Sequence, residues 1–542
     1  MALPNGLEQK PMPNWTNGHE NFTQPLKPNA SFKLRIPNLS SPQAQYRQTT
    51  ANFQWLIQHA IDNNLRMRAL GKGWSFSDVA ATDGGLVDTL ALRQSFALRD
   101  SFVDPAYRAA GKSTGNLYFT ECGMSIIKLE QILEPAGKSI RASGASNAQT
   151  IAGALSTGTH GGAFRFGAVH DSVVGLHLVT APDRHVWLER ASNPVAAPEF
   201  TDWLGVTEVY RDDDLFNSAV VSFGSFGFIH GVLLEIENLF LLEDYSTQKV
   251  PYTSALKKAM TDQDLTGLLP WLPLPVNDPT KEPYHLGVVV NPHQFDPTGA
   301  DLNRGAYVQV RYKTPYRPNY PRPQPKPSGF TYGDDTLGLI QTVLDKMGRL
   351  ALKHIPKLVN QLYPLAFEDT NGTAGTISEV FGSTNIRGKA VSAAIGVDSH
   401  DTPRVLEEIV KLNQQVAFPG LLGMRFVKGT PATLGFTRFP VTCVMELDGV
   451  QAKVTNEFLQ RLWNRLEALR IPYTLHWGKT NFNLSESLVL QMYGQANVET
   501  WLRSRQKLLD APARAVFTNA FMERCGLGKE LMPAQPVPPV IV

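Results

Sequence analysis

The stretch from residue 143 to residue 175, SGASNAQTIAGALSTGTHGGAFRFGAVHDSVVG, decides how the rest of the chain is interpreted. It holds seven glycines with Ser and Thr between them, and it leads directly into the strand-like segment LHLVT at 176–180. Glycines let the main chain approach a ligand closely, and successive free N–H groups in a turn make a concave anion site. The stretch therefore predicts a loop that binds a phosphate-bearing cofactor.

The composition favours a soluble protein of more than one domain. A chain of 542 residues is too long for one core. The 51 Lys and Arg nearly balance 49 Asp and Glu, which gives no field for nucleic acid or for an anionic membrane. The N-terminus, MALPNGLEQKPMPNW, has no apolar signal region, and we find no apolar run of about 18 residues. We expect a cytoplasmic chain without membrane insertion or nucleic-acid partners, unless a signal sequence has been removed.

The three cysteines, Cys122, Cys443 and Cys525, are far apart and show no CxxC spacing. Such spacing predicts neither a disulfide framework nor a zinc site. We expect no bound metal.

Helix-period and strand-period segments alternate along the chain, which indicates an α+β fold. Residues 1–45 are rich in Pro and Asn and predict an extended arm. Residues 46–243 carry the glycine-rich segments and predict one domain, and residues 244–484 predict a second. Residues 485–542 predict a helical C-terminal segment that returns to the first domain.

Two further glycine-bearing segments are GKGWSFSD at 71–78 and FGSFGFI at 223–229. A Gly-x-Gly turn alone often does no more than connect two strands. GKGWSFSD is neither a Rossmann fingerprint nor a Walker loop, because no GxGxxG opens a helix and no GK[ST] follows. The order and intervals of these segments, together with the opening stretch, carry the stronger signal.

In that order, GKGWS, QTIAGALSTGTHG, VVGLHLVT and FGSFGFI resemble the PCMH-type FAD-binding domain of the vanillyl-alcohol-oxidase flavoprotein superfamily. HWGK at 476–479 and VFTN at 516–519 are similar to its sugar-lactone and alditol oxidase branch. The resemblance covers 50–240 well and the last 70 residues moderately, but it is poor for 245–420. It implies a two-domain α+β flavoprotein, with a substrate (cap) domain built on an antiparallel sheet.

Carried over position by position, the resemblance implies three groups of FAD-binding residues. They are Gly71, Lys72, Gly73, Trp74 and Ser75 in the first loop; Ser146, Gln149, Thr150, Gly153, Ser156, Thr157, Thr159, His160 and Gly161 in the second; and Gly224, Gly227 and Ile229 in the third. Many relatives attach the flavin to a histidine at the position of Trp74, and others attach it to a second-loop cysteine that SGASNAQT lacks. We therefore predict non-covalent FAD.

On the substrate side, Lys479 and His476 of HWGK are candidates to stabilise reduced flavin and to orient the substrate. Cys122 matches a small residue that controls access of O₂ in lactone-acting relatives, although a buried core cysteine is an equal alternative. The Glu and Arg that alditol-acting relatives carry on a cap strand are missing from VSAAIGVDS (391–399). Arg425 and Glu446 remain as charged candidates, and each could equally form a structural pair.

The resemblance implies an FAD-dependent enzyme that oxidises a small-molecule alcohol by hydride transfer to flavin N5, with O₂ or another acceptor taking the electrons. Oxidase and dehydrogenase both stay open. Aromatic residues of the cap, Phe426, Phe436 and Phe439, would suit a substrate larger and less polar than a polyol. The alternatives are an NADPH-using reductase with the same FAD fold and an FAD-binding homologue that has lost redox function.

Overall fold

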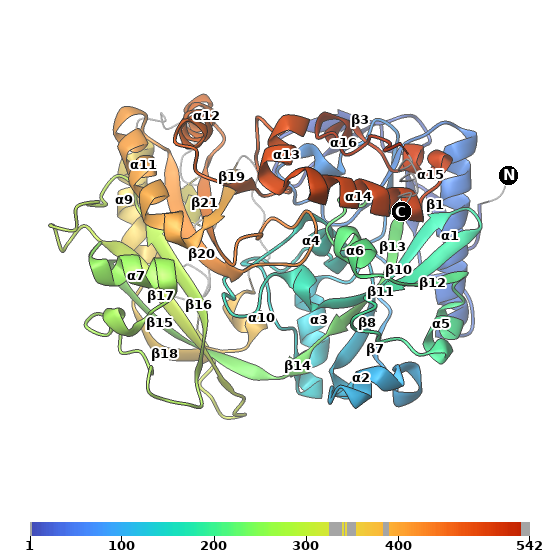
Figure 1. Cartoon of the computed structure of the whole chain (residues 1–542), viewed down its shortest axis with the longest axis horizontal. Coiled ribbons are helices and arrows are strands. Elements are labelled where there is room, and N and C mark those ends of the chain that lie inside the picture. The colour runs from blue at the N-terminus through green and yellow to red at the C-terminus, as the bar shows by residue number, and fades with distance from the viewer. Residues whose placement is uncertain (1–2, 325–338, 341, 344–353, 383–389, 533–542) are drawn as a thin grey trace, which may run out of the picture.

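The computed structural model describes residues 3–324, 339–340, 342–343, 354–382 and 390–532. Within them the chain forms two halves that lie side by side in Figure 1. One half holds the strands up to β14 together with the C-terminal helices. The other half is built on one eight-stranded sheet, whose first strand along the chain is β15. No helix in these ranges is long and apolar enough to cross a membrane.

The first half contains two main sheets, with strand orders β1-β4-β6-β5 and β12-β11-β10-β13-β8-β7. Two short hairpin-like pairs, β2-β3 and β14-β9, accompany them. The strands are β1 (Leu7–Gln9), β2 (Asn14–Thr16), β3 (Thr23–Pro25), β4 (Phe32–Leu34), β5 (Met67–Leu70), β6 (Gly85–Asp88), β7 (Ser95–Ala97), β8 (Leu117–Glu121), β9 (Lys138–Ser139), β10 (Val173–Ala181), β11 (Arg184–Glu189), β12 (Glu208–Arg211), β13 (Phe228–Glu235) and β14 (Glu237–Asn238).

Helix α1 shows why these residues take up their local structure. Ser41 caps its first turn by accepting the N–H of Ala44, and the helix buries Phe53, Leu56 and Ile57. The helices of this half are α1 (Pro42–Asp62), α2 (Pro105–Ala109), α3 (Ile126–Leu133), α4 (Ile151–Thr157), α5 (Pro198–Leu204) and α6 (Asp213–Ala219).

The second half is one large sheet with the strand order β18-β15-β17-β16-β20-β21-β19-β22, and its pairs are all antiparallel. This confirms the expected antiparallel cap sheet and the α+β fold. The strands are β15 (Phe240–Val250), β16 (Glu282–Val290), β17 (Ala306–Pro315), β18 (Thr370–Gly375), β19 (Ala390–Asp398), β20 (Gly420–Lys428), β21 (Val441–Val450) and β22 (Thr474–Leu475). The helices are α7 (Ser254–Asp262), α9 (Ile355–Ala366), α10 (Ile377–Val380), α11 (Thr402–Gln415) and α12 (Lys453–Ala468).

The N-terminal turn between β2 and β3 joins both halves. The Gly18 amide donates to the Gly73 carbonyl at 2.7 Å, and Asn17 Nδ2 donates to the Ser75 carbonyl at 2.8 Å. Asn21 Nδ2 donates to the carbonyl of Ala390, the first residue of β19, at 3.0 Å. The turn therefore spans from the first glycine loop to the cap sheet.

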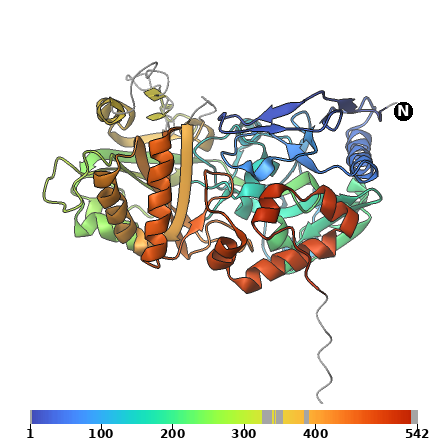
Figure 2. The same cartoon turned by 90° about the horizontal axis from the view of Figure 1, so that it is seen from above.

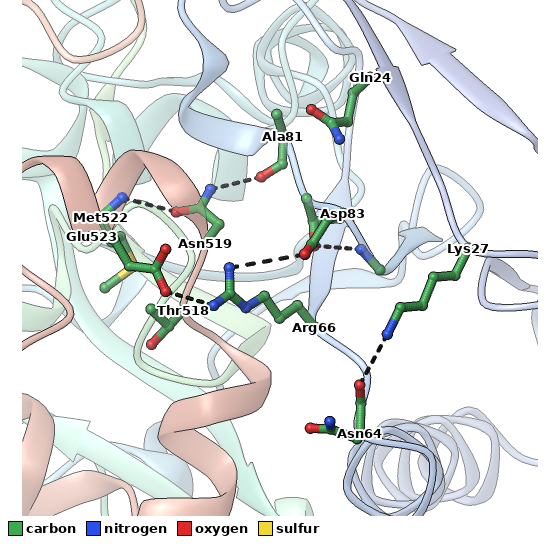
Figure 3. Close-up of polar contacts among 12 residues, drawn as sticks. Gln24, Lys27, Asn64, Arg66, Ala81, Asp83, Thr518, Asn519, Met522 and Glu523 are labelled. Atoms are coloured by element: carbon green, nitrogen blue, oxygen red, sulfur yellow. Dashed lines mark hydrogen bonds and ion pairs between the residues drawn. The ribbon is translucent and has the colours of Figure 1, made fainter.

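The C-terminal helices α13 (Glu486–Tyr493), α14 (Gln495–Leu508), α15 (Ala511–Val516) and α16 (Ala520–Arg524) pack on the first half. Figure 2 shows them along the side of that half opposite the N-terminal strands. Asn519 caps α16 and donates to the Val79 and Ala81 carbonyls at 3.0 and 2.7 Å. Figure 3 shows this junction, where Arg66 also reaches Glu523 at 2.5 Å. The domain limits themselves stay a prediction.

Candidate cofactor and active site

One cavity runs from the glycine loops of the first half to strands β20 and β21 of the cap. Every residue predicted for FAD lines it except Gly161. A Cβ at Gly161 would lie 2.1 Å from the Ser143 carbonyl oxygen, so this glycine serves close backbone packing instead. Arg425, Glu446, His476, Lys479 and Cys122 line the same cavity. The structure thus brings the separate sequence motifs to one place.

The first two glycine loops touch each other directly. A Cβ at Gly71 would come within 2.4 Å of Thr150 Oγ1, so only glycine allows this approach. Thr150 also caps α4 by accepting the Gly153 amide at 3.3 Å. Gly158 ends the helix in the left-handed region, with φ of 78°. The small residues of 143–175 therefore shape a short helix and its tight packing against the first loop.

The HWGK segment lies against the first glycine loop. The Phe76 amide donates to the Gly478 carbonyl at 2.8 Å, and the Ser77 hydroxyl donates to the Trp477 carbonyl at 2.5 Å. Trp477 itself is fully buried, and its indole N–H donates to the Leu434 carbonyl at 2.8 Å. These bonds hold Lys479 and His476 at the wall that the first loop also forms.

The residues of this wall fit FAD. Glycines and small hydroxyl residues from three loops line the cavity, and Gln149 Oε1 is buried there without a hydrogen-bond partner among the described residues. A buried acceptor without a donor is costly, so a bound group that donates to it would remove that cost. Trp74 also lines the cavity, at the position where the resemblance places a linking histidine.

Three charged side chains meet at the cap end of the cavity. Arg425 on β20 and Glu446 on β21 form an ion pair at 3.2 Å, and Lys479 Nζ lies 4.0 Å from the other Glu446 oxygen. Lys479 Nζ also donates to the Ser392 hydroxyl of β19 at 2.7 Å. Burial alone would raise the pKa of Glu446, but Arg425 and Lys479 more than offset it and the pKa is lowered. Two cations and one carboxylate leave this end of the cavity with net positive charge.

Two neutral histidines stand beside the charges, with ring centroids 5.5 Å apart. His476 Nδ1 accepts the Gly478 amide at 3.0 Å, which assigns its proton to Nε2. His160 Nδ1 faces the Gly161 carbonyl at 3.1 Å, which assigns its proton to Nδ1 and leaves Nε2 as an acceptor. Burial lowers the pKa of His160 to about 4, against the raising effect of Glu446. Burial also places the pKa of His476 well below its usual value.

The three cap phenylalanines, Phe426, Phe436 and Phe439, do not line this cavity, so they give no support to a larger, less polar substrate, which stays a prediction. Phe436 instead packs against the His476 and His160 rings at 5.0 and 5.5 Å. The sheet pleat turns Phe426 into the core, where it is fully buried. Phe439 lies in the loop between β20 and β21.

Sequence reasoning missed two aromatic residues of the wall, His19 and Phe76. Their rings stack at 3.8 Å, and Lys479 Nζ lies 5.3 Å from the Phe76 centroid. His19 Nδ1 is buried without a partner among the described residues. Burial, assisted by Lys479, lowers the pKa of His19 to about 3. A single histidine in a Pro/Asn-rich arm carries no periodicity that could have revealed it.

Cys122 follows β8, lines the cavity and is 2% exposed. Burial raises the pKa of its thiol, with a further contribution from Glu121, so it is present as the neutral thiol. Its cavity position agrees with the sequence prediction. The control of O₂ access stays a prediction.

Comparison with known proteins supports the cofactor expectation. Residues 46–189 match a family of FAD binding domains. The chain is 30% identical over 167 residues to an L-gulono-1,4-lactone dehydrogenase of Mycobacterium tuberculosis, covering 31% of this chain and 36% of the relative. It is 34% identical over 198 residues to L-gulonolactone oxidase 3 of Arabidopsis thaliana, covering 36% and 30%. The matched region spans about a third of the length of these curated relatives.

Solved structures share the fold over nearly the whole chain. A cholesterol oxidase from B. sterolicum superposes with a TM-score of 0.65 at 13% identity, covering 97% of this chain and 99% of the other. A solvent-stable cholesterol oxidase gives 0.62 at 15% identity, covering 95% and 97%. At such identities the likeness establishes the two-domain arrangement alone.

Proposed function

Because the chain is a flavoprotein of the vanillyl-alcohol-oxidase superfamily with an FAD-binding domain, we propose that it is an FAD-dependent oxidoreductase acting on a CH–OH group. The observation that carries this proposal is the cavity that joins the three glycine loops to the buried Glu446 and to the partly buried Arg425 and Lys479. FAD bound there would accept a hydride from the alcohol carbon at N5 and pass the electrons to O₂ or another acceptor.

Lys479 supplies a fixed cation beside the cofactor loops. Its ammonium is held by Ser392 and lies within 4.0 Å of Glu446, so it does not reorganise when the charge of the bound group changes. A preorganised cation stabilises negative charge that accumulates as the cofactor is reduced. Arg425 balances Glu446 at 3.2 Å and keeps that carboxylate ionised.

The two histidines offer one donor and one acceptor to a substrate hydroxyl. The Nε2–H of His476 can donate a hydrogen bond to the hydroxyl oxygen of the substrate. Nε2 of His160 can accept a hydrogen bond from the same hydroxyl group. Both rings are neutral at pH 7 because burial lowers the pKa of each. They can therefore orient an alcohol for loss of hydrogen from its carbon.

Two alternatives remain proposals of a different class. An NADPH-using reductase with this FAD fold would be reduced by NADPH instead of by an alcohol. A homologue without redox function would bind FAD and react with neither.

A single anaerobic experiment separates these functions. The purified yellow protein is mixed with L-gulono-1,4-lactone, D-arabinono-1,4-lactone, a polyol, cholesterol, a phenolic alcohol or NADPH, and the flavin absorption band is followed. We expect an alcohol or lactone to bleach it, and bleaching by NADPH alone, or by nothing, contradicts the proposal. Lys479→Met should slow the bleaching about 100-fold. The matched control Lys428→Met, which changes an exposed lysine of the same cap sheet, should not.

The absence of a linking histidine at Trp74 gives a separate test. On acid precipitation the yellow colour should remain in the supernatant. Colour that stays with the pellet means that FAD is covalently bound.

A further inference from the structure

Two arginines are buried in the first half without a carboxylate partner. Arg68 on β5 is 2% exposed and Arg505 on α14 is 1% exposed. Among the described residues, no ion pair joins either guanidinium to an acid, and Arg68 Nε lacks any hydrogen-bond partner. A buried charge is retained only where something compensates it. The mechanism proposed above uses neither residue.

Both arginines hold the backbone of the third glycine loop. Arg68 Nη1 donates to the Phe223 carbonyl at 2.8 Å, and Arg505 Nε donates to the Ser225 carbonyl at 3.0 Å. Phe223 has φ of 58°, a left-handed conformation that a bulky residue rarely adopts. Its amide donates to the Ser156 carbonyl of α4 at 3.0 Å. The strained turn is thus held by hydrogen bonds at the Phe223 amide and carbonyl and at the Ser225 carbonyl.

This arrangement decides where the free amide of the loop points. In a trans peptide the N–H lies opposite the carbonyl, and no described peptide bond is cis. Arg68 binds the Phe223 carbonyl, so the Gly224 N–H of the same peptide points away from Arg68. In the described part of the chain the Gly224 amide has no acceptor, and both Gly224 and Gly227 line the cavity. The turn therefore leaves an unpaired N–H donor at a residue that lines the cavity, on the side away from Arg68.

The cations stay protonated at neutral pH. Burial, with repulsion from Arg505 and Arg66, lowers the pKa of Arg68 to about 9. Burial, with repulsion from Arg514, lowers the pKa of Arg505 to about 9. Among the described residues, Glu530 is the carboxylate that raises the pKa of Arg505, and it is 61% exposed and pairs with Arg514 at 2.7 Å. The neighbourhood is therefore electropositive and lacks a counter-charge from the described residues.

We propose that Arg68 and Arg505 are positioning residues for the pyrophosphate of FAD, which they hold through the turn 222–227. The two arginines bind the Phe223 and Ser225 carbonyls of the turn and so leave the Gly224 amide for the cofactor. They also supply the positive charge that the pyrophosphate neutralises. This inference rests on the FAD-binding part of the proposed function, not on any substrate. It also makes α14 of the C-terminal segment part of the cofactor site.

The test compares flavins that differ in phosphate content. Dissociation constants for FAD, FMN and riboflavin are measured by flavin fluorescence on the full chain, in the wild type and in Arg68→Met and Arg505→Met. The matched control is Arg66→Met, which removes the arginine one residue before β5; its side chain pairs with Glu523 of the C-terminal helix α16 (Figure 3). We expect FAD to bind at least about tenfold more weakly in the two buried variants, with riboflavin changed less than about threefold. The control should keep the wild-type ratio.

Equal weakening of all three flavins, or an equal loss in Arg66→Met, overturns the proposal. Should the methionine variants fail to fold, Arg68→Lys keeps the charge but loses the fork geometry. The ³¹P resonances of bound FAD should then shift relative to wild type, whereas those of Arg66→Lys should not. Unshifted resonances in Arg68→Lys overturn the proposal. None of these readouts depends on turnover, so failure here is distinct from failure to find an alcohol substrate.

Discussion

The buried ion pair of the cap end gives the sharpest prediction on stability. Glu446→Gln removes the carboxylate that lies 3.2 Å from Arg425 and 4.0 Å from Lys479. With an effective dielectric constant of about 20, each attraction is worth about 4–5 kcal/mol before desolvation is subtracted. Breaking one partner of a buried pair leaves the other charge uncompensated and typically costs about 3 kcal/mol. The unfolding entropy of a 542-residue chain is about 1.1 kcal/mol/K, so the thermal midpoint should fall by about 3 °C.

A double-mutant cycle distinguishes this interaction from loss of volume. Arg425→Met alone should also lower the midpoint by about 3 °C, because Glu446 then keeps only the more distant Lys479. The double variant Arg425→Met/Glu446→Gln should fall by about 3 °C in total, since each change removes the charge that the other leaves unpaired, and Lys479 keeps its bond to Ser392. The assay is differential scanning calorimetry at pH 7.5 with saturating FAD. A double variant that falls by about 6 °C shows the two side chains to be independent and refutes the reasoning.

Three further predictions concern single side chains. His19→Ala removes the unpaired Nδ1 of His19 from the cavity and should lower kcat/KM about tenfold. The control Thr23→Ala on the same hairpin should leave kcat/KM unchanged. Steady-state kinetics with the best alcohol substrate measures both. Ser392→Ala removes the hydroxyl that accepts from Lys479 and should slow anaerobic flavin reduction about tenfold in stopped flow. Ser399→Ala, just after the end of the same strand, is the control. An unchanged rate in Ser392→Ala contradicts the proposal that Ser392 holds Lys479 in place. His160 has a folded pKa of about 4 against 6.5 when unfolded, so its contribution is intact above pH 6.5 and lost as the pH falls toward 4. Between pH 6.5 and 5 this amounts to about 2 kcal/mol, and His160→Asn should flatten the acid side of a melting profile.

The cofactor end could be predicted from sequence because its determinants are local. Glycines such as Gly71 are required by close approaches that no other residue tolerates, and the caps Thr150 and Gly158 flank one short helix. A ligand site formed by backbone groups requires particular residue types in a particular order, so the sequence can reveal it. The antiparallel cap sheet and the position of Lys479 followed from the resemblance for the same reason.

Arg425 and Glu446 were candidates from the sequence and both line the cavity, but their pairing could not be predicted because it depends on the register between distant strands. Arg425 and Glu446 meet because β20 pairs with β21 so that Gly423 faces Glu446 and Arg425 faces Val444. The strand 391–399 carries no Glu or Arg, and the ion pair at this end of the cavity comes from two neighbouring strands instead. No local pattern in GMRFVKGT or VMELDG records that pairing. For Phe426 the same limit holds, since one position along a strand exchanges core for cavity.

The termini complete the site that the matched domain begins. The family match ends at residue 189, yet His19 comes from the N-terminal turn and Arg505 from the C-terminal helix α14. His19 and Phe76 form an aromatic wall beside Lys479, and the turn that carries His19 is tied to both Gly73 and Ala390. Any movement of the cap relative to the FAD half must stretch or break the Asn21 bond to β19. The arm that looks least informative in the sequence therefore lies beside Lys479 at the cap end of the cavity.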